Sequence, residues 1–265
     1  MTERYPWFGK VIAIARHAGT AIMEIYSGDI EVQHKLDQSP LTQADLAAHQ
    51  VIEQGLKRLT PDIPILSEES AAVPYEVRAS WQRYWLVDPL DGTREFIKRN
   101  DEFTVNIAFI EQGRPVLGVV YAPAKGMLYY ACIGHGAYKI EDGGKAMPIR
   151  ARMLDPNNMT VAGSRSHANV RLQAFLRNLN THELISLGSS LKICLVAEGK
   201  ADVYPRLGPT SEWDTAAAQC VLEQAGGQLV DHASEPLRYN TKDSLLNPEF
   251  FACGATPHNW SQYLE

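Results

Sequence analysis

A short acidic turn directly follows an apolar stretch, and its residues could hold a metal ion. Residues 84–87 are aromatic and β-branched, which predicts a buried strand, and they run into Asp88-Pro-Leu-Asp-Gly-Thr93. Pro89 disfavours helical geometry at Asp88, so the carboxylates of Asp88 and Asp91 can converge across the turn. Converging carboxylates repel one another unless a cation lies between them. We therefore predict a divalent-metal site at this turn.

The residues after the second carboxylate suit a phosphate group. Gly92 permits backbone angles or a close ligand approach that other residues resist. Gly92 and Thr93 offer backbone N–H groups where a short helix could begin, and Thr93 adds a hydroxyl. Hard oxygen ligands select Mg²⁺ or Mn²⁺ rather than zinc. Two such ions would clamp a phosphate, acidify an attacking water and neutralise the leaving alkoxide. This predicts hydrolysis of a phosphomonoester without a covalent enzyme intermediate.

Three more carboxylates stand where they could join this site. Glu68 follows a short predicted strand, as Asp88 does, and adjacent strand ends would bring the two together. Asp214 directly precedes an apolar helix and could point into a cleft between two lobes. Asp45 ends Thr42-Gln-Ala-Asp45, which is typical of a capping box with Asp in place of Glu. Taken singly, an acidic turn, an exposed glutamate and helix-capping aspartates are the ordinary alternatives.

The N-terminal part of the chain is predicted to form two helices and a mostly antiparallel sheet. Residues 7–26, and a helix that opens at Thr42, carry apolar side chains at helical spacing. Residues 84–150 contain alternating strands joined by glycine-containing turns. Residues 71–82 are predicted to be a mobile loop. We expect the two helices to cover this sheet.

From about residue 155 strands and helices alternate, which predicts a second lobe of α/β type with helices covering its sheet. The last predicted elements are a strand at residues 250–253 and a helix at 258–264. We divide the chain into an N-terminal α+β lobe, residues 1–152, and a C-terminal α/β lobe, residues 153–265. The first would carry most metal ligands, and the second Asp214 and substrate specificity, in one compact catalytic unit.

Composition narrows the classes of function. The 265 residues are 45% hydrophobic, enough for one large domain or two small domains in contact. The net charge of −6 gives no electrostatic reason to bind nucleic acid or an acidic membrane. The sequence has no CxxC pair, and no apolar run approaches the ~20 residues of a membrane span. EF-hand, P-loop, GxGxxG and serine nucleophile-elbow motifs are absent as well. We expect a cytoplasmic protein with reduced, buried cysteines.

The chain carries three motifs in a set order, which are Ser67-Glu-Glu-Ser70, Asp88-Pro-Leu-Asp-Gly-Thr93 and Trp213-Asp-Thr-Ala-Ala217. Together they resemble the inositol monophosphatase superfamily of Mg²⁺-dependent, lithium-sensitive phosphatases, and the resemblance covers essentially the whole chain. Within it the chain most resembles the CysQ-type 3′(2′),5′-bisphosphate nucleotidases, through Ser67, Gly163-Ser-Arg-Ser-His167 and residues 188–206. The fold implied is a layered α/β/α/β/α sandwich.

The resemblance implies a set of metal ligands. Glu68, Asp88 and the Leu90 carbonyl would hold one Mg²⁺. Asp88, Asp91 and Asp214 would hold a second, and a third, looser Mg²⁺ would visit near Glu68. Mn²⁺ would substitute for Mg²⁺, and Li⁺ would inhibit.

The resemblance also implies catalytic and substrate-binding residues. Thr93, hydrogen-bonded to Asp45, would orient the attacking water with Glu68 helping as base. The N–H groups of Gly92 and Thr93 would bind the scissile phosphate. The full substrate-binding set is Glu68, Leu90, Asp91, Gly92, Thr93, Ser164, His167, Ser189, Lys192, Arg206 and Asp214. The C-terminal members of this set are polar residues at predicted strand ends or helix starts, where they could recognise a nucleotide.

The implied reaction is hydrolysis of adenosine 3′,5′-bisphosphate, a by-product of sulfate activation and transfer, to AMP and phosphate. The implied partner is this small nucleotide alone, and the protein would be a monomer or a homodimer without a stable membrane anchor. Relatives of this type in bacteria are described at the cytoplasmic face of the inner membrane.

Two other functions stay open. An inositol or sugar-phosphate monoesterase would use the same acidic site, and only the polar residues of the second lobe separate it from a nucleotidase. A non-catalytic metal- or nucleotide-responsive binding protein would have a degenerate site, which the intact set of acidic residues disfavours.

Overall fold

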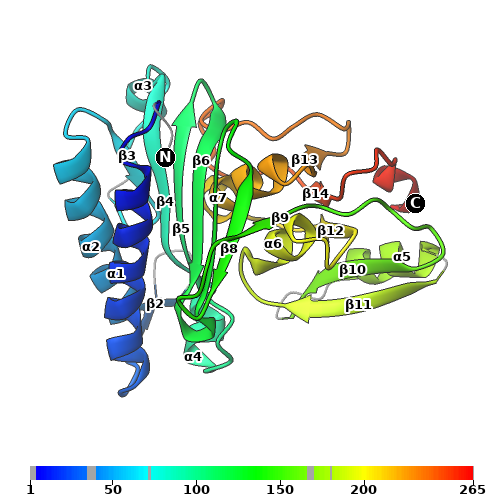
Figure 1. The fold of residues 1–265 in the computed structure, drawn as a ribbon, viewed down its shortest axis with the longest axis horizontal. Coiled ribbons are helices and arrows are strands. Elements are labelled where there is room, and N and C mark those ends of the chain that lie inside the picture. Colours follow the sequence, from blue (N-terminus) through cyan, green and yellow to red (C-terminus); the bar gives the residue numbers. More distant parts are fainter. Residues whose placement is uncertain (1–3, 35–39, 71–72, 166–169, 180, 265) are drawn as a thin grey trace.

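Two β-sheets alternate with three layers of helix in the computed structural model (Figure 1). The structure describes residues 4–34, 40–70, 73–165, 170–179 and 181–264. The layer order is α1 and α2, a seven-stranded sheet, α6 and α7, a five-stranded sheet, and finally α5 with a short 3₁₀ helix. This is the layered α/β/α/β/α sandwich that the resemblance implies.

Helices α1 (Phe8–Tyr26) and α2 (Gln43–Leu59) form the first layer and pack on the seven-stranded sheet. A small antiparallel pair, β1 (Val32–His34) and β2 (Pro40–Thr42), leads into α2. The strands of the large sheet lie side by side in chain order, and only the first pair is parallel. They are β3 (Ile65–Ser67), β4 (Arg83–Asp91), β5 (Thr104–Glu111), β6 (Arg114–Ala122), β7 (Met127–Cys132), β8 (Ala137–Glu141) and β9 (Met147–Ile149), with a 3₁₀ helix, η1 (Pro123–Lys125), between β6 and β7.

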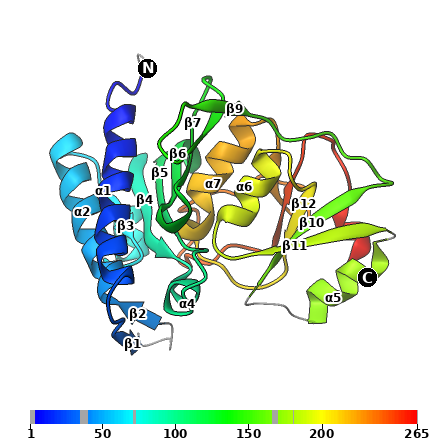
Figure 2. The same ribbon diagram turned by 60° about the horizontal axis from the view of Figure 1, so that its bottom comes forward.

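Helices α6 (Leu191–Ala197) and α7 (Glu212–Gln224) form the middle layer, between the two sheets (Figure 2). Helix α7 approaches the large sheet so closely that a Cβ atom added at Gly118 of β6 would lie 2.2 Å from the Ala217 carbonyl oxygen. The run of small side chains at residues 216–218 permits this contact. Because α7 also carries Asp214, the contact fixes that residue relative to the large sheet.

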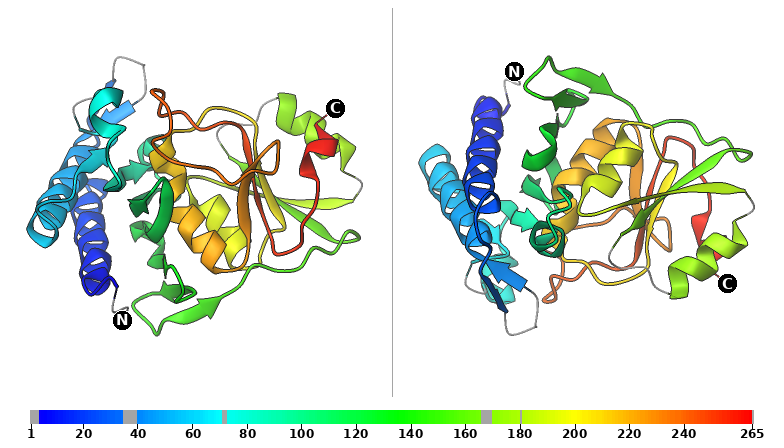
Figure 3. Two further views of the ribbon diagram at one scale, coloured as in Figure 1. Left: turned by 90° about the horizontal axis from the view of Figure 1, so that it is seen from above. Right: turned by 90° about the horizontal axis from the view of Figure 1, so that it is seen from below.

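The second sheet has the strand order β11-β10-β12-β14-β13. Its strands are β10 (Met159–Ser164), β11 (His182–Leu187), β12 (Val203–Arg206), β13 (Gln228–Asp231) and β14 (Phe250–Cys253). Alternate residues separate the two faces: Tyr204 and Phe250 face α6 and α7, whereas Val203 and Phe251 face the outer layer. That outer layer contains α5 (Val170–Asn178) and η2 (Trp260–Tyr263). Seen from above and from below, it lies on the opposite side of the molecule from α1 and α2 (Figure 3).

Two sequence-based expectations need correction, and residues 71–72 of the predicted mobile loop lie outside the described residues. Residues 73–82 are not a featureless loop, because they contain α3 (Tyr75–Arg78) and bury Arg78. The Arg78 guanidinium donates to Asn240 Oδ1 at 2.6 Å, a contact between distant segments that no local pattern reveals. The C-terminal helix is a single 3₁₀ turn rather than residues 258–264.

The two halves of the chain share one core, because residues of the large sheet and of α6, α7 and the second sheet form one buried cluster. The domain boundary at residue 152 stays a prediction, and it falls in the segment that links β9 to β10. Among the helices of the described residues, none has both the length and the apolar character that a membrane crossing requires.

Candidate active site

The parallel pairing of β3 with β4 ends at the centre of the site. Strand β3 pairs with β4 so that Ser67 lies opposite Val87, and the Glu68 N–H donates to the Val87 carbonyl at 3.1 Å. The next residue on each strand is therefore a carboxylate, Glu68 on one and Asp88 on the other. The predicted meeting of these two residues is confirmed, but Asp88 lies within β4, which continues to Asp91, rather than after the end of a strand.

The acidic turn is a distortion at the end of β4. The pairing of β4 with β5 shifts register between Asp88 and Asp91. Asp88 is only 1% exposed, and its Oδ1 accepts a hydrogen bond from the Leu90 N–H at 3.0 Å, which bends the chain back on itself. Gly92 then takes a left-handed conformation with φ of 93°, and α4 (Thr93–Ile97) begins. A residue with a Cβ atom would be strained at that position.

Two helix starts hold the other aspartates in the same way. Asp45 is the third residue of α2, and its Oδ2 accepts from the N–H of the N-cap residue Thr42 at 2.8 Å. Asp214 is the third residue of α7, and its Oδ2 accepts from the Ser211 N–H at 2.9 Å. Both are capping boxes. The predicted box at Asp45 is confirmed, whereas Asp214 is not an N-cap, because α7 begins earlier than the expected residue 215.

The hydroxyl of Thr93 joins the acidic turn to α2. It donates to Asp45 Oδ1 at 3.2 Å and lies 3.4 Å from the Leu90 carbonyl oxygen. Asp45 therefore uses one oxygen to cap its helix and the other to receive the Thr93 hydroxyl. The structure brings together the pair that the resemblance implied.

Three carboxylates converge closely enough to share a cation. Oxygen atoms of Glu68, Asp88 and Asp214 all lie within 4.8 Å of one another. Asp91 lies beside them but is not in this group of three. Its Oδ2 accepts the Ser190 N–H at 2.6 Å and faces the Asn106 amide at 3.5 Å. Asp91 thus connects the acidic turn to the segment before α6.

We call Glu68, Asp88, Asp91 and Asp214 the acidic cluster. Burial and repulsion between these carboxylates disfavour the ionised forms of the three aspartates. Burial, followed by the charges of Glu68, Asp91, Asp214 and Asp45, raises the pKa of Asp88 well above its ordinary value. Burial and the charges of Asp91 and Glu68 likewise raise the pKa of Asp214. Burial raises the pKa of Asp91 to about 6, although Lys192 and the Ser190 N–H oppose the shift. A set of oxygen donors that repel one another suits a hard divalent cation such as Mg²⁺.

The acidic cluster forms one wall of a cavity of about 270 Å³ that both halves of the chain line. The N-terminal half contributes Pro40, Glu68, Asp91, Gly92, Thr93, Arg94 and Glu95. The C-terminal half contributes Ser164, Gly188, Ser189, Ser190, Lys192, Ile193, Tyr204, Arg206, Pro209, Thr210, Asp214, Thr215 and Phe250. Of the predicted substrate-binding residues in the C-terminal half, Ser164, Ser189, Lys192 and Arg206 therefore line the cavity, and His167 lies outside the described residues.

A buried lysine adds positive charge to the cavity, and we call Lys192 with Arg206 the cationic wall. Lys192 is 5% exposed, and its Nζ donates to the Ser189 carbonyl at 2.5 Å and lies 5.2 Å from the centre of the Tyr204 ring. Burial lowers the pKa of Lys192 to about 8, while Asp91 opposes the shift. Arg206 lies nearby and donates to the Pro209 carbonyl at 2.6 Å. A cavity lined by both carboxylates and cations can hold a metal-bound phosphate and a second anionic group.

The sequence reasoning missed several lining residues. Tyr204 lies two residues before the predicted Arg206 on β12, so the alternation of a strand could have placed it on the same face. Phe250 pairs with Arg206 across the sheet and has no sequence signal of its own. Glu95 is buried in the first turn of α4. Its charge directly after the acidic turn was a signal in the sequence.

Comparisons with known proteins agree with this geometry. The model of the inositol monophosphatase family matches residues 7–260. The 3′(2′),5′-bisphosphate nucleotidase CysQ of Salmonella typhimurium is 54% identical over 243 residues, which cover 91% of this chain and 97% of that protein. The crystal structure of CysQ from Bacteroides thetaiotaomicron is 43% identical, has a TM-score of 0.81, and covers 94% of this chain and 97% of its own. An inositol monophosphatase (IMPase) from Thermotoga maritima, 24% identical with a TM-score of 0.79 over 96% of this chain and 94% of its own, shares the fold. The chain therefore belongs to the inositol monophosphatase family.

Proposed function

We propose that this protein is a 3′(2′),5′-bisphosphate nucleotidase that converts adenosine 3′,5′-bisphosphate to AMP and phosphate. One observation carries the proposal: the acidic cluster and the cationic wall with Lys192 and Arg206 line the same cavity. A substrate with two phosphates can occupy both walls at once. The names of the relatives from Salmonella and Bacteroides support the same substrate class.

The acidic residues would hold Mg²⁺. Glu68, Asp88 and the Leu90 carbonyl supply ligands for one ion. Asp88, Asp91 and Asp214 supply ligands for a second, with Mn²⁺ as a substitute, Li⁺ as an inhibitor and space near Glu68 for a third ion. When bound, such ions neutralise phosphate charge and lower the pKa of a bound water. Convergence of three carboxylates within 4.8 Å supports this assignment.

The chain itself would position the attacking water and receive its proton. Because the Thr93 hydroxyl donates to Asp45 Oδ1, the lone pairs of Thr93 Oγ1 are left to accept a hydrogen bond from water. A proton leaving the water can pass to Thr93 Oγ1 while the Thr93 proton moves to Asp45, and Glu68 assists as base. The N–H groups of Gly92 and Thr93, at the start of α4, would bind the scissile phosphate.

The C-terminal half would select the substrate. Lys192 and Arg206 would attract the 5′-phosphate, and Ser164, Ser189 and His167 would add hydrogen bonds. Tyr204 and Phe250 also line the cavity, but they are only 4% and 1% exposed, so they shape it rather than offer a stacking surface. Inositol 1-phosphate carries no second phosphate for Lys192 and Arg206. The cytoplasmic location and the monomeric or dimeric state stay predictions.

Phosphate release from a substrate panel tests the proposal. The panel contains adenosine 3′,5′-bisphosphate, adenosine 2′,5′-bisphosphate, inositol 1-phosphate and fructose 1,6-bisphosphate, each with Mg²⁺, with EDTA, and with Mg²⁺ plus Li⁺. We expect Mg²⁺-dependent, Li⁺-inhibited turnover with the highest kcat/KM for an adenosine bisphosphate. A much higher kcat/KM for inositol 1-phosphate would replace the proposal with an inositol phosphatase, and Mg²⁺-dependent nucleotide binding without phosphate release would replace it with a binding protein.

A further inference from the structure

A carboxylate outside the acidic cluster joins the two halves of the chain next to Gly188, which lines the cavity. Glu102, between α4 and β5, is 5% exposed. Its Oε2 accepts from Arg165 Nε and from the Gly188 N–H, both at 2.8 Å. Its Oε1 accepts from Arg165 Nη2 at 2.8 Å. Both oxygens of one side chain in the N-terminal half are therefore occupied by donors from the C-terminal half.

The segment that Glu102 contacts, residues 188–190, has little freedom to move elsewhere. A Cβ atom added at Gly188 would lie 2.7 Å from Glu95 Cγ and 2.8 Å from the Glu102 carbonyl oxygen. Ser189 has a positive φ of 50°, which is unusual for a residue with a side chain. Ser190 donates its N–H to Asp91 Oδ2 at 2.6 Å. Acceptors of the N-terminal half, Glu102 and Asp91, thus hold the segment at both ends.

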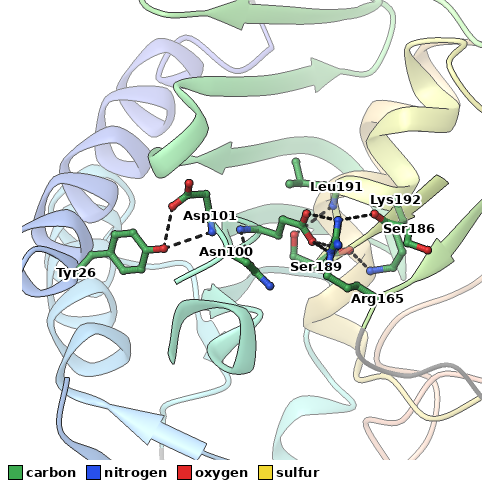
Figure 4. Close-up of polar contacts among 10 residues, drawn as sticks. Tyr26, Asn100, Asp101, Arg165, Ser186, Ser189, Leu191 and Lys192 are labelled. Carbon is green, nitrogen blue, oxygen red and sulfur yellow. Dashed lines mark hydrogen bonds and ion pairs between the residues drawn. The ribbon is translucent and has the colours of Figure 1, made fainter. Parts of the chain in front are cut away.

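This segment positions the cationic wall. The Ser189 carbonyl accepts from Lys192 Nζ, so the place of residue 189 sets the place of the buried ammonium group. Arg165 follows Ser164, which also lines the cavity, and donates to the Ser186 carbonyl at 2.9 Å. Figure 4 shows Arg165, Ser186, Ser189 and Lys192 gathered at this boundary. A displacement of Glu102 would therefore reach Ser164 through Arg165 and Lys192 through Ser189, while Asp91 still holds Ser190.

Glu102 is itself anchored from the other side. Its N–H donates to Asn100 Oδ1 at 3.1 Å. The neighbouring Asp101 accepts the Tyr26 hydroxyl at 2.8 Å, and the Asp101 N–H faces the same hydroxyl at 3.3 Å (Figure 4). Since Tyr26 is the last residue of α1, the loop before β5 is tied to the first layer. The Glu102 carboxylate is thus a fixed point against which residues 188–190 can be held.

We propose that Glu102, with Arg165, is a positioning residue that determines specificity for substrates with a second phosphate. It acts by fixing Ser189 and Lys192 at the distance from the acidic cluster that such a substrate spans. The ion pair also keeps the Arg165 guanidinium bound to Glu102, although the Arg165 side chain is 49% exposed. Loss of Glu102 would weaken binding of a bisphosphate nucleotide while leaving hydrolysis of a small monoester intact. The inference rests on the proposed function and names a residue that controls it.

Kinetics on two substrates test this inference. Glu102→Ala, Glu102→Gln and Arg165→Ala are compared with wild type on adenosine 3′,5′-bisphosphate and on p-nitrophenyl phosphate, with Mg²⁺ present. The matched control is Arg171→Ala, which removes a guanidinium that pairs with Glu249 at an exposed site of the same half. We expect Glu102→Ala to lower kcat/KM for the bisphosphate by about tenfold or more, chiefly through KM. Turnover of the small ester should stay within about twofold.

The variants also separate positioning from simple loss of structure. Glu102→Gln keeps an oxygen that can accept the Gly188 N–H, so it should recover part of the preference that Glu102→Ala loses. Arg165→Ala should lower the preference, and Arg171→Ala should leave it unchanged. An unchanged preference in Glu102→Ala, or equal losses on both substrates, would overturn the inference. A wild-type protein without preference for the bisphosphate would overturn the proposed function together with this inference, so the two failures are distinguishable.

Discussion

Removal of one charge at Asp91 should stabilise the protein without metal and destabilise it relative to wild type when Mg²⁺ is added. Burial raises the pKa of Asp91 from its ordinary 3.8 to about 6. A shift of about two units corresponds to roughly 3 kcal/mol by which folding disfavours the ionised carboxylate. Asp91→Asn removes that cost and keeps an oxygen that can accept the Ser190 N–H.

Neighbouring charges modify this magnitude in both directions. The charge of Asp91 raises the pKa values of Asp88 and Asp214, so removing that charge also reduces the cost of ionising these two residues. Lys192 loses a favourable partner, because Asp91 raises the pKa of that lysine. We expect a net gain of about 1–3 kcal/mol in the free energy of unfolding, or a Tm higher by roughly 2–6 °C for a chain of this size.

The pH dependence has a definite sign. A carboxyl group with a raised folded-state pKa costs no stability below its unfolded value of 3.8, and the cost grows to its full size above about 6. In EDTA, the Tm advantage of Asp91→Asn should be present at pH 8 and disappear as the pH falls toward 4. Asp62→Asn, at an exposed aspartate outside the site, is the matched control and should show no such change.

Thermal unfolding with and without Mg²⁺ completes the test. A ligand at one thousand times its dissociation constant adds about 4.1 kcal/mol to the stability of the folded state, which exceeds the advantage of the variant. Wild type should gain this stabilisation, whereas Asp91→Asn should gain little of it and lose nearly all kcat. The order of the two Tm values should therefore reverse on adding Mg²⁺. A variant that is less stable than wild type in EDTA at pH 8, or that gains the same Tm with Mg²⁺, would refute the reasoning.

Further predictions concern the water-positioning pair, the cationic wall and the helix contact. Thr93→Val removes the hydroxyl that donates to Asp45 and should lower kcat by about 10²-fold or more, while the Mg²⁺-dependent rise in Tm persists; unchanged phosphate release would exclude the role. Lys192→Met and Arg206→Ala should raise KM for adenosine 3′,5′-bisphosphate and spare inositol 1-phosphate; parallel losses in steady-state assays would argue against a 5′-phosphate site. Gly118→Ala should lower the unfolding free energy by about 1–3 kcal/mol in urea titrations, because a Cβ atom would meet the backbone of α7 at 2.2 Å; an unchanged midpoint would show that the helix can move away.

Local signals in the sequence were sufficient for much of the fold and for the acidic cluster. Strand ends followed by carboxylates predicted that Glu68 meets Asp88, because parallel neighbours end at one edge of a sheet. The capping box at Asp45 has a four-residue pattern, and the same pattern at Ser211 would have placed the start of α7 correctly. These features depend on residues that are close in sequence.

Contacts between distant segments could not be predicted in this way. The ion pair of Glu102 and Arg165 joins residues 63 positions apart, and neither has a neighbour in sequence that marks it. Burial of Arg78 likewise depends on a carbonyl group and an amide more than 160 positions away. Such pairings arise only when the two sheets are assembled around α6 and α7. The residues of the cationic wall were named through the resemblance, whereas the hydrogen bonds that place them, such as that of Ser190 to Asp91, join distant segments.

The identity of the product tests the central claim most directly. Wild-type protein with Mg²⁺ is incubated with adenosine 3′,5′-bisphosphate, and the nucleotide formed is separated chromatographically and compared with AMP and with adenosine 3′-monophosphate. With the scissile phosphate at the acidic cluster and the 5′-phosphate at Lys192 and Arg206, the account predicts AMP and one phosphate, with no product in EDTA. Formation of adenosine 3′-monophosphate, or an intact substrate beside rapid hydrolysis of inositol 1-phosphate, would contradict it.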